Sequence, residues 1–244
     1  MRLDRYLVEA GLAESREKAK ALIKEGRVRV GGEVVSKPAH PVGTGDAVEV
    51  EPGTRYVGRA ALKLKGALSA FPVDPAGKVA LDVGAGTGGF TEVLLEHGAR
   101  RVYAVDVGRG QLHPRLAADP RVVPMEGVNA REGIPLPEPA EFAVMDVAFI
   151  SSTLVLPALG AALLPGADAL VLVKPQFELG PGVRVVGDPE GWRRAVERVK
   201  QAARELGFAV RGEAESPLVG KRGNREFWLW LRAPRQNPGR SEPR

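Results

Sequence analysis

Three polar residues stand where apolar runs of this sequence begin or end, which places them to act on a ligand. Asp146 and Lys174 each close an apolar run, and Glu226 comes just before another. Carboxylates and amines in such positions can orient a substrate and move its protons. A single charge there is equally often a strand that reaches water, so the prediction of a site rests on the three together.

A glycine-rich segment follows the apolar run Val79–Val83 and is typical of a cofactor loop. Its glycines allow a sharp turn and a close approach of the ligand to a helix N-terminus. With an acidic residue at the end of the next strand, the pattern suits both NAD and S-adenosylmethionine (SAM). The residues expected at the cofactor are Asp82, Gly84, Gly86, Gly88, Gly89, Phe90 and Asp106.

Charge distinguishes these two cofactors. Asp82 lies immediately before the glycine loop, where it would repel a pyrophosphate. SAM instead presents an ammonium and a sulfonium, which a carboxylate attracts. The surrounding segment, residues 71–191, holds 9 basic and 15 acidic residues, in agreement with a cationic cofactor. The sequence therefore favours SAM over NAD, and over a glycine turn that holds nothing.

The basic residues gather in the flanks of the chain. The net charge is +5, to which residues 1–50 contribute +1, residues 51–70 contribute +3 and residues 192–244 contribute +7, against −6 for residues 71–191. This distribution indicates an anionic partner, such as nucleic acid, that approaches the flanks while the acidic middle holds the cofactor.

Composition excludes several classes of protein. The absence of Cys excludes a disulfide scaffold, a Cys-ligated zinc site and a cysteine nucleophile. His97 and His113 have no partner at metal-ligand spacing, so we expect no metal site. The charged start Met1–Arg5 does not resemble a signal peptide, and no stretch approaches the roughly 18 apolar residues of a membrane span. We therefore expect a cytoplasmic protein without a membrane partner.

The elements that must position these residues alternate along the chain beyond residue 78. Alternation of strands and helices at this spacing predicts a mostly parallel sheet covered on both faces. A helix at Arg59–Leu68 is expected before it. The expected strands are Val79–Val83, Arg101–Asp106, Val122–Pro124, Phe142–Asp146, Ala169–Lys174, Phe208–Arg211 and Phe227–Leu231, and the expected helices are Phe90–His97, Ser152–Leu163 and Gly191–Leu206.

The first fifty residues predict a separate small module. Two helices are expected, the second capped by Ser15 and ended by Gly26, followed by a hairpin that turns at Gly31 and Gly32. Along the second helix three cations recur every four residues and form one ridge. The pattern resembles the S4 RNA-binding module, and the alternative is a solvated basic helix face. The residues expected to contact RNA are Arg2, Arg5, Arg16, Lys20, Lys24 and Arg27.

Nearly the whole chain resembles the TlyA, or hemolysin A, family of ribosomal RNA 2′-O-methyltransferases, in which an S4 module precedes an FtsJ-like methyltransferase domain. The Lys-Pro-Gln-Phe-Glu run at 174–178 is the most specific of the matching segments. The others are residues 59–64, 82–84, 87–91, 106–112, 146–151, 216–217 and 223–227. The segment Leu179–Asp188 is unlike the family, so its role stays open.

The resemblance implies a class I, Rossmann-like α/β methyltransferase fold, with a mostly parallel seven-stranded sheet, beside a small α+β S4 module. We expect the S4-like module at residues 1–50, a linker at 51–58, the methyltransferase domain at 59–233 and a disordered tail at 234–244. The resemblance also implies SAM as cofactor, a cytidine of ribosomal RNA or of a ribosomal subunit as substrate, and Asn129 near the adenine. A capped turn is an equal interpretation of Asn129.

The resemblance further implies a catalytic tetrad of Lys63, Asp146, Lys174 and Glu226. A ribose hydroxyl is a poor nucleophile, so in-line methyl transfer needs orientation and removal of its proton. We expect Lys174 to be the base, because partial burial and the second ammonium of Lys63 would favour its neutral form. Asp146 and Glu226 would hold the lysines and the hydroxyl in line.

Three other functions are compatible with parts of the sequence. A non-catalytic RNA-binding protein would keep the S4 module and a degenerate cofactor domain. An NAD-dependent oxidoreductase would use the glycine loop but leave the basic flanks without a role. A pore-forming hemolysin would need a membrane-inserting segment, and the sequence shows neither a span nor a strongly amphipathic apolar and cationic helix.

Overall fold

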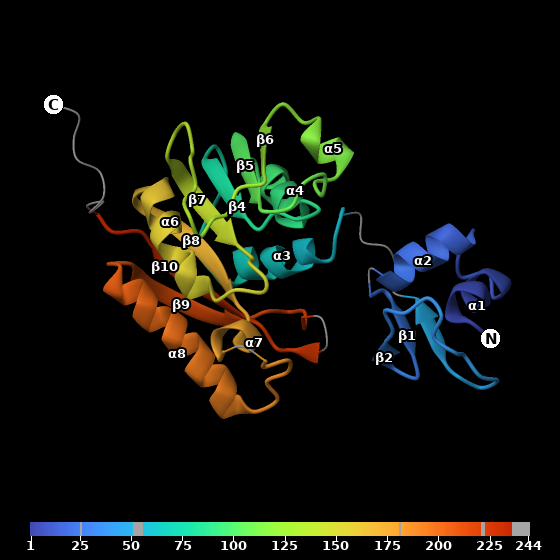
Figure 1. Ribbon diagram of the computed structural model, residues 1–244. Coiled ribbons are helices and arrows are strands. Elements are labelled where there is room, and N and C mark those ends of the chain that lie inside the picture. Colours follow the sequence, from blue (N-terminus) through green and yellow to red (C-terminus); the bar gives the residue numbers. More distant parts are fainter. Residues whose placement is uncertain (25, 51–55, 181, 221–222, 236–244) are drawn as a thin grey trace. The chain divides into compact units, whose positions relative to one another are not determined.

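The computed structural model describes residues 1–24, 26–50, 56–180, 182–220 and 223–235. These fall into two units, Met1–Arg59 and Ala60–Arg244. Residues 51–55 of the expected linker and residues 236–244 of the expected tail lie outside the described residues. Each unit is considered by itself below (Figure 1).

The first unit packs two helices beside a three-stranded antiparallel sheet with the order β2-β1-β3. Ser15 caps the second helix as expected, since its Oγ accepts a hydrogen bond from the Lys18 amide at 3.2 Å. Leu3, Leu7 and Ile23 are fully buried between the elements. The elements are α1 (Leu3–Glu9), α2 (Arg16–Lys24), β1 (Val28–Val30), β2 (Glu33–Val34) and β3 (Val48–Val50).

The second unit is built on a seven-stranded sheet with the order β6-β5-β4-β7-β8-β10-β9. Its strands are β4 (Val79–Val83), β5 (Arg101–Asp106), β6 (Val122–Glu126), β7 (Ala140–Met145), β8 (Leu163–Val173), β9 (Ala209–Glu215) and β10 (Phe227–Arg232). The pairings from β6 to β8 are parallel, and β10 runs antiparallel to both of its neighbours. The predicted mostly parallel sheet is confirmed.

Helices cover both faces of this sheet (Figure 1). The helices of the second unit are α3 (Ala60–Ala70), α4 (Gly89–Glu96), α5 (Pro114–Ala117), α6 (Leu156–Ala162), α7 (Pro175–Glu178) and α8 (Pro189–Glu205), with a 3-10 turn η1 (Ser152–Leu154). On β10, Leu229 joins the core formed with α6 and α8, whereas the adjacent Trp228 contacts Phe90 of α4. Because neighbouring strand residues point to opposite faces, α4 lies across the sheet from α6 and α8.

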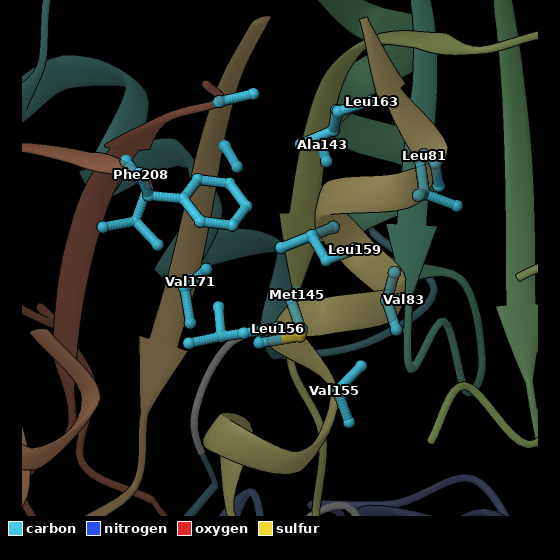
Figure 2. Close-up of a cluster of buried hydrophobic side chains, with 14 of the residues drawn as sticks. Leu81, Val83, Ala143, Met145, Val155, Leu156, Leu159, Leu163, Val171 and Phe208 are labelled. Carbon is cyan, nitrogen blue, oxygen red and sulfur yellow. The ribbon is translucent and has the colours of Figure 1, made fainter. Parts of the chain in front are cut away.

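The core between the sheet and α6 packs against the parallel strands whose carboxyl ends carry the candidate functional residues. Figure 2 shows Leu156 and Leu159 of α6 among side chains of the parallel strands, including Val83, Met145 and Val171. All five are nearly or fully buried. Truncation of one such leucine to alanine typically costs about 2–5 kcal/mol of stability, so this packing fixes the strand ends firmly.

The structure differs from the predicted elements at helix starts. The expected single helix Ser152–Leu163 is η1 followed by α6, because Pro157 suits the first turn of a new helix and not the interior of a continuous one. Strand β8 begins at Leu163, whereas the predicted strand began at Ala169. The short helices α5 and α7, each opened by a proline, were not predicted because four residues show no periodicity.

Candidate active site

Three aspartates meet at the carboxyl edge of the parallel strands. Asp82 lies in β4, Asp106 ends β5, and Asp146 follows β7. Strand β4 pairs with β5 on one side and with β7 on the other, so the order of the strands reverses there. Open α/β sheets bind ligands in the crevice at such a reversal.

The glycine loop between β4 and α4 is shaped by contacts that leave no room for side chains. Gly84 has φ +84°, and a Cβ on it would lie 2.4 Å from the Asp146 carbonyl oxygen. Gly88 has φ +96° and precedes α4; a Cβ there would lie 2.4 Å from Leu116 Cδ1. These positions therefore need glycine, for the turn and for close packing, as the sequence pattern indicated.

Asp106 ties the loop to the end of β5. Its carboxylate accepts hydrogen bonds from the Gly86 amide at 2.8 Å and from the Gly108 amide at 2.7 Å. Each carboxylate oxygen can accept a second hydrogen bond, so Asp106 keeps capacity for a ribose hydroxyl. A Cβ on Gly86 would meet nothing within 4 Å, which leaves open space beside the loop.

Asp82 is fully buried beside the loop, in an environment that suits a cation. Its Oδ2 accepts a hydrogen bond from Thr91 Oγ1 at 2.7 Å, and its buried Oδ1 has no hydrogen-bond partner among the residues that the structure describes. Burial is the main cause that raises the pKa of Asp82 to about 7; the charges of Asp146 and Asp106 add to it, and hydrogen bonds from Thr91 oppose it. A cationic ligand would relieve this cost, whereas a pyrophosphate would increase it. The residues present thus fit SAM.

The four residues of the expected tetrad form two ion pairs. Lys63 Nζ of α3 lies 2.5 Å from Glu226 Oε2, just before β10. Lys174, directly after β8, pairs with Asp146. The lysine side chains are 13% and 11% exposed, so both pairs are largely removed from water.

The two ion pairs also interact with each other electrostatically. Burial raises the pKa of Glu226, while Lys63 and, more weakly, Lys174 lower it, and Asp146 raises it. Glu226 therefore lies within electrostatic reach of the other three residues, which come from segments spread over more than half of the chain. Desolvation of the charges often makes a buried ion pair no more stabilising than apolar residues of similar volume, so stability alone does not account for this arrangement.

The structure pairs Lys174 with Asp146, one of the two carboxylates expected to hold the lysines in line. An ammonium must lose a proton before it can act as a base, so the role of Lys174 as the base stays a prediction.

Two residues expected at the cofactor are engaged elsewhere through their side chains. The ring of Phe90 is buried against Trp228, with ring centroids 5.5 Å apart, so any contact of Phe90 with a cofactor would come from its backbone. Asn129 caps a turn, donating to Glu132 at 2.7 Å and accepting from the Arg131 amide at 3.2 Å. The structure thus shows the turn interpretation of Asn129 in place, and its contact with adenine stays a prediction.

Comparison with known proteins assigns both units. Residues 56–233 match the model of the FtsJ-like methyltransferase family, and residues 1–48 match that of the S4 domain. The chain belongs to the FtsJ-like methyltransferase family. We refer below to Met1–Arg59 as the S4 unit and to Ala60–Arg244 as the FtsJ-like unit.

Three relatives illustrate the similarity. The 16S/23S rRNA (cytidine-2′-O)-methyltransferase TlyA of Mycobacterium tuberculosis H37Rv is 47% identical over 239 residues, which cover 95% of this chain and 89% of the relative. Hemolysin A of Brachyspira hyodysenteriae is 37% identical over 234 residues, covering 93% and 98%. A Streptococcus thermophilus protein solved under a hemolysin name is 39% identical with a TM-score of 0.75, covering 96% and 88%.

The names of these relatives include both a methyltransferase and a hemolysin. Within the part of the chain that the structure describes, none of the helices has the length and apolar character of a membrane-spanning segment. Among the same residues, no group of three or more His, Cys, Asp or Glu is arranged to hold a metal ion.

The structure adds residues of the FtsJ-like unit to which the sequence gave no role. Phe149 follows β7, has φ +69° and is 89% exposed, and its ring centroid lies 5.6 Å from that of Phe177. The buried carboxylate of Glu178 holds the same loop, accepting hydrogen bonds from the Ser151 hydroxyl and from the Ser152 amide. An aromatic residue three positions after a strand-ending Asp was the available sequence signal.

The cations expected to contact RNA lie on the surface of the S4 unit, with one exception. Arg2, Arg5, Arg16, Lys20 and Lys24 are exposed, and Arg27 is only partly exposed. The α2 ridge of Arg16, Lys20 and Lys24 is therefore present as an accessible row of positive charge.

Proposed function

We propose that this protein is a SAM-dependent methyltransferase that methylates a ribose 2′-hydroxyl of ribosomal RNA. The observation that carries the proposal is the assembly of Lys63, Asp146, Lys174 and Glu226 beside the buried acidic edge that suits a cationic cofactor. The substrate class is supported by the S4 domain match and by the activity for which the TlyA relative is named, and cytidine is the expected nucleotide.

The residues of the FtsJ-like unit divide the work between the cofactor and the acceptor. Asp82, Asp106 and the loop from Gly84 to Gly89 would hold SAM, with Phe90 contributing through its backbone and Asn129 at the adenine. When bound, SAM supplies a methyl group activated by its sulfonium. The open space at Gly86 and the glycine turn allow the close backbone approach that such a ligand needs.

The tetrad would act on the ribose hydroxyl. Asp146 fixes the Lys174 amine, and Glu226 fixes that of Lys63, so neither lysine is free to swing away from the acceptor. Lys174, once neutral, would take the proton of the 2′-hydroxyl, and SAM would supply the methyl group that this oxygen accepts. Lys63 stabilises the negative charge that develops on that oxygen.

The assembled tetrad also separates this proposal from a non-catalytic RNA-binding protein. A degenerate domain would have no reason to keep two largely buried ion pairs next to each other, because apolar residues of similar size are often at least as stabilising. The exposed ring of Phe149 adds a surface on which the base of the acceptor nucleotide can stack. Since the proposed substrate is ribosomal RNA, we expect the protein to act in the cytoplasm.

The deciding experiment measures methyl transfer and SAM binding in the same variants. We expect Lys174→Ala to lose about 10²- to 10⁴-fold in methyl transfer to ribosomal RNA, with SAM affinity by calorimetry nearly unchanged. Lys63→Ala should also lose transfer. Lys65→Ala, on the same helix but in a surface pair with Glu96 at 3.7 Å, is the matched control and should stay active. Full activity of Lys174→Ala would overturn the tetrad, and failure of the wild type to bind SAM would overturn the enzyme.

A further inference from the structure

Asp4 is a buried carboxylate inside the cationic surface of the S4 unit, where a negative charge would at first sight oppose RNA binding. Its side chain is 0% exposed, in the first turn of α1. No other part of the proposed function uses it. Two arginines from different elements meet on it, Arg2 before α1 and Arg16 at the start of α2.

The contacts fix both guanidinium groups on one carboxylate. Arg2 binds it with two nitrogens, Nε at 3.0 Å from Oδ1 and Nη2 at 3.2 Å from Oδ2. Arg16 Nη2 lies 3.0 Å from the same Oδ2. The hydrogen bonds of Arg2, followed by those of Arg16, hold the pKa of Asp4 well below its usual range despite its burial. The carboxylate is therefore charged at any physiological pH.

The arginines remain available to a ligand although they are held. Their side chains are 53% and 56% exposed, and each guanidinium has more N–H donors than these contacts use. Free arginine side chains lose rotamer entropy when they bind a phosphate, and a side chain that is already fixed loses less. Two guanidinium groups that share one oxygen also stand close together, which ordinary charge repulsion would prevent.

We propose that Asp4 is a positioning residue for RNA binding. It holds Arg2 and Arg16 as a preformed pair, and this pair binds the phosphodiester backbone. The guanidinium fork matches a phosphate with two parallel hydrogen bonds. This inference rests on the proposed function, because it takes ribosomal RNA as the ligand. Arg5 is different: its partner Glu9 is itself 46% exposed, so that pair is screened and loosely held.

The proposal and simple electrostatics predict opposite signs for the loss of Asp4. Removing a negative charge from a phosphate-binding surface should strengthen RNA binding if charge alone decides. Loss of the preformed pair should instead weaken it. We expect Asp4→Asn to bind ribosomal RNA about 5- to 10-fold more weakly than the wild type. Glu9→Gln, which removes one exposed carboxylate from the same helix, is the matched control and should bind equally or more tightly.

The experiment measures the affinity of the full-length protein for transcribed 16S and 23S ribosomal RNA by filter binding over a series of salt concentrations. A wild type without salt-dependent RNA affinity would contradict the proposed function itself. A normal wild type with Asp4→Asn as tight as Glu9→Gln would overturn the role of Asp4 alone. In an Arg2→Gln/Arg16→Gln background, Asp4→Asn should cause no further loss, whereas a merely structural role of Asp4 would weaken both backgrounds.

A second variant leaves the buried residue in place, in case Asp4→Asn destabilises the S4 unit. Arg2→Lys/Arg16→Lys keeps both positive charges at exposed positions but replaces the rigid forks with flexible point charges. We expect about 5-fold weaker RNA binding with an unchanged salt slope, because the number of phosphate contacts stays the same. Wild-type affinity in this variant would overturn the proposal.

Discussion

Asp4 and Asp82 are both fully buried, yet their environments drive them in opposite directions. In the S4 unit, two arginines surround Asp4 and keep its pKa well below the usual range. In the FtsJ-like unit, Thr91 donates hydrogen bonds to Asp82 but two further carboxylates lie nearby, and burial raises the pKa of Asp82 to about 7. Burial alone therefore does not decide whether the charged form of a carboxylate is favoured; the charges around it also do.

The two carboxylates differ in whether the protein itself supplies their partners. Asp4 is satisfied by the protein itself, so the S4 unit is complete before any ligand arrives. Within the described part of the chain, one oxygen of Asp82 has no hydrogen-bond partner and no cationic side chain is paired with it. Unbalanced buried charge is unfavourable in the free protein, and a cationic ligand that supplies the balance gains affinity from it. A site of this kind is preorganised for its ligand at the expense of stability.

The largest effect is expected from removing the charge of Asp82. Asp82→Asn keeps the shape of the side chain and a hydrogen bond with Thr91, but it cannot balance a cation. We expect SAM affinity to fall about 10- to 100-fold, as for the loss of a charged hydrogen bond. At the same time, the free energy of unfolding at pH 8 should rise by about 1–3 kcal/mol, because a desolvated charge is removed. Calorimetric titration and urea unfolding measure the two quantities.

The control for this prediction is a ligand with less charge. S-adenosylhomocysteine keeps the ammonium but lacks the sulfonium, so a smaller loss of its affinity would show that Asp82 stabilises the sulfonium. An equal loss would assign the effect to the ammonium. A variant that is less stable than the wild type at pH 8 and binds SAM normally would refute the contrast with Asp4.

In the wild type, SAM binding by the FtsJ-like unit and RNA binding by the S4 unit should depend on pH in different ways. Because the pKa of folded Asp82 is raised to about 7, Asp82 takes up a proton as the pH falls through 7, and SAM affinity should drop by up to about tenfold per pH unit below that value. The folded protein then binds more protons than the unfolded chain, so this group favours stability at low pH, and its contribution is lost as the pH rises from about 4 to 7.

Asp4 gives the opposite expectation for RNA binding. The pKa of Asp4 is lowered in the folded protein. Its contribution to folding stability is therefore fully present above the ordinary pKa of an aspartate, and it is lost only as the pH falls below about 4. RNA affinity should therefore carry no contribution from Asp4 titration between about pH 5 and 8. Calorimetry with SAM and filter binding with ribosomal RNA over this range would test both. A flat SAM profile in the wild type would contradict the raised pKa of Asp82.

Much of the fold could be predicted because its sequence patterns are local. Strand β4 and strand β5 have the predicted bounds, since each is a short apolar run ended by a turn or a charge. The split of the expected helix had a local signal in Pro157, which periodicity alone does not show, whereas the early start of β8 at Leu163 depends on how the segment pairs in the sheet. The order of the strands was not predicted, because it depends on pairing between distant segments that no local pattern indicates.

The site could be predicted residue by residue but not in its contacts. Types and spacing marked Asp82, Asp146 and Lys174, and the resemblance added Lys63. The pairing of Lys63 with Glu226 joins residues 163 positions apart, and no local pattern indicates it. The burial of the Phe90 ring and the double contact on Asp4 likewise depend on packing in three dimensions, whereas the turn at Asn129 is local and was one of its two expected interpretations.

The smallest effect is expected from Thr91, whose side chain opposes the raised pKa of Asp82 by a hydrogen bond. Thr91→Val removes the hydroxyl that donates at 2.7 Å but keeps the shape and the backbone N–H. Without this donor the charged form of Asp82 is less favourable, so the midpoint of the SAM affinity profile should move above pH 7 by about one unit. At neutral pH the affinity should then fall about 3- to 5-fold and recover in more alkaline buffer. Thr91→Ser restores the hydroxyl and should restore the wild-type midpoint. If Thr91→Val instead lowered SAM affinity equally at every pH, Thr91 would act by packing, and the balance of charge at Asp82 would not be what tunes the site.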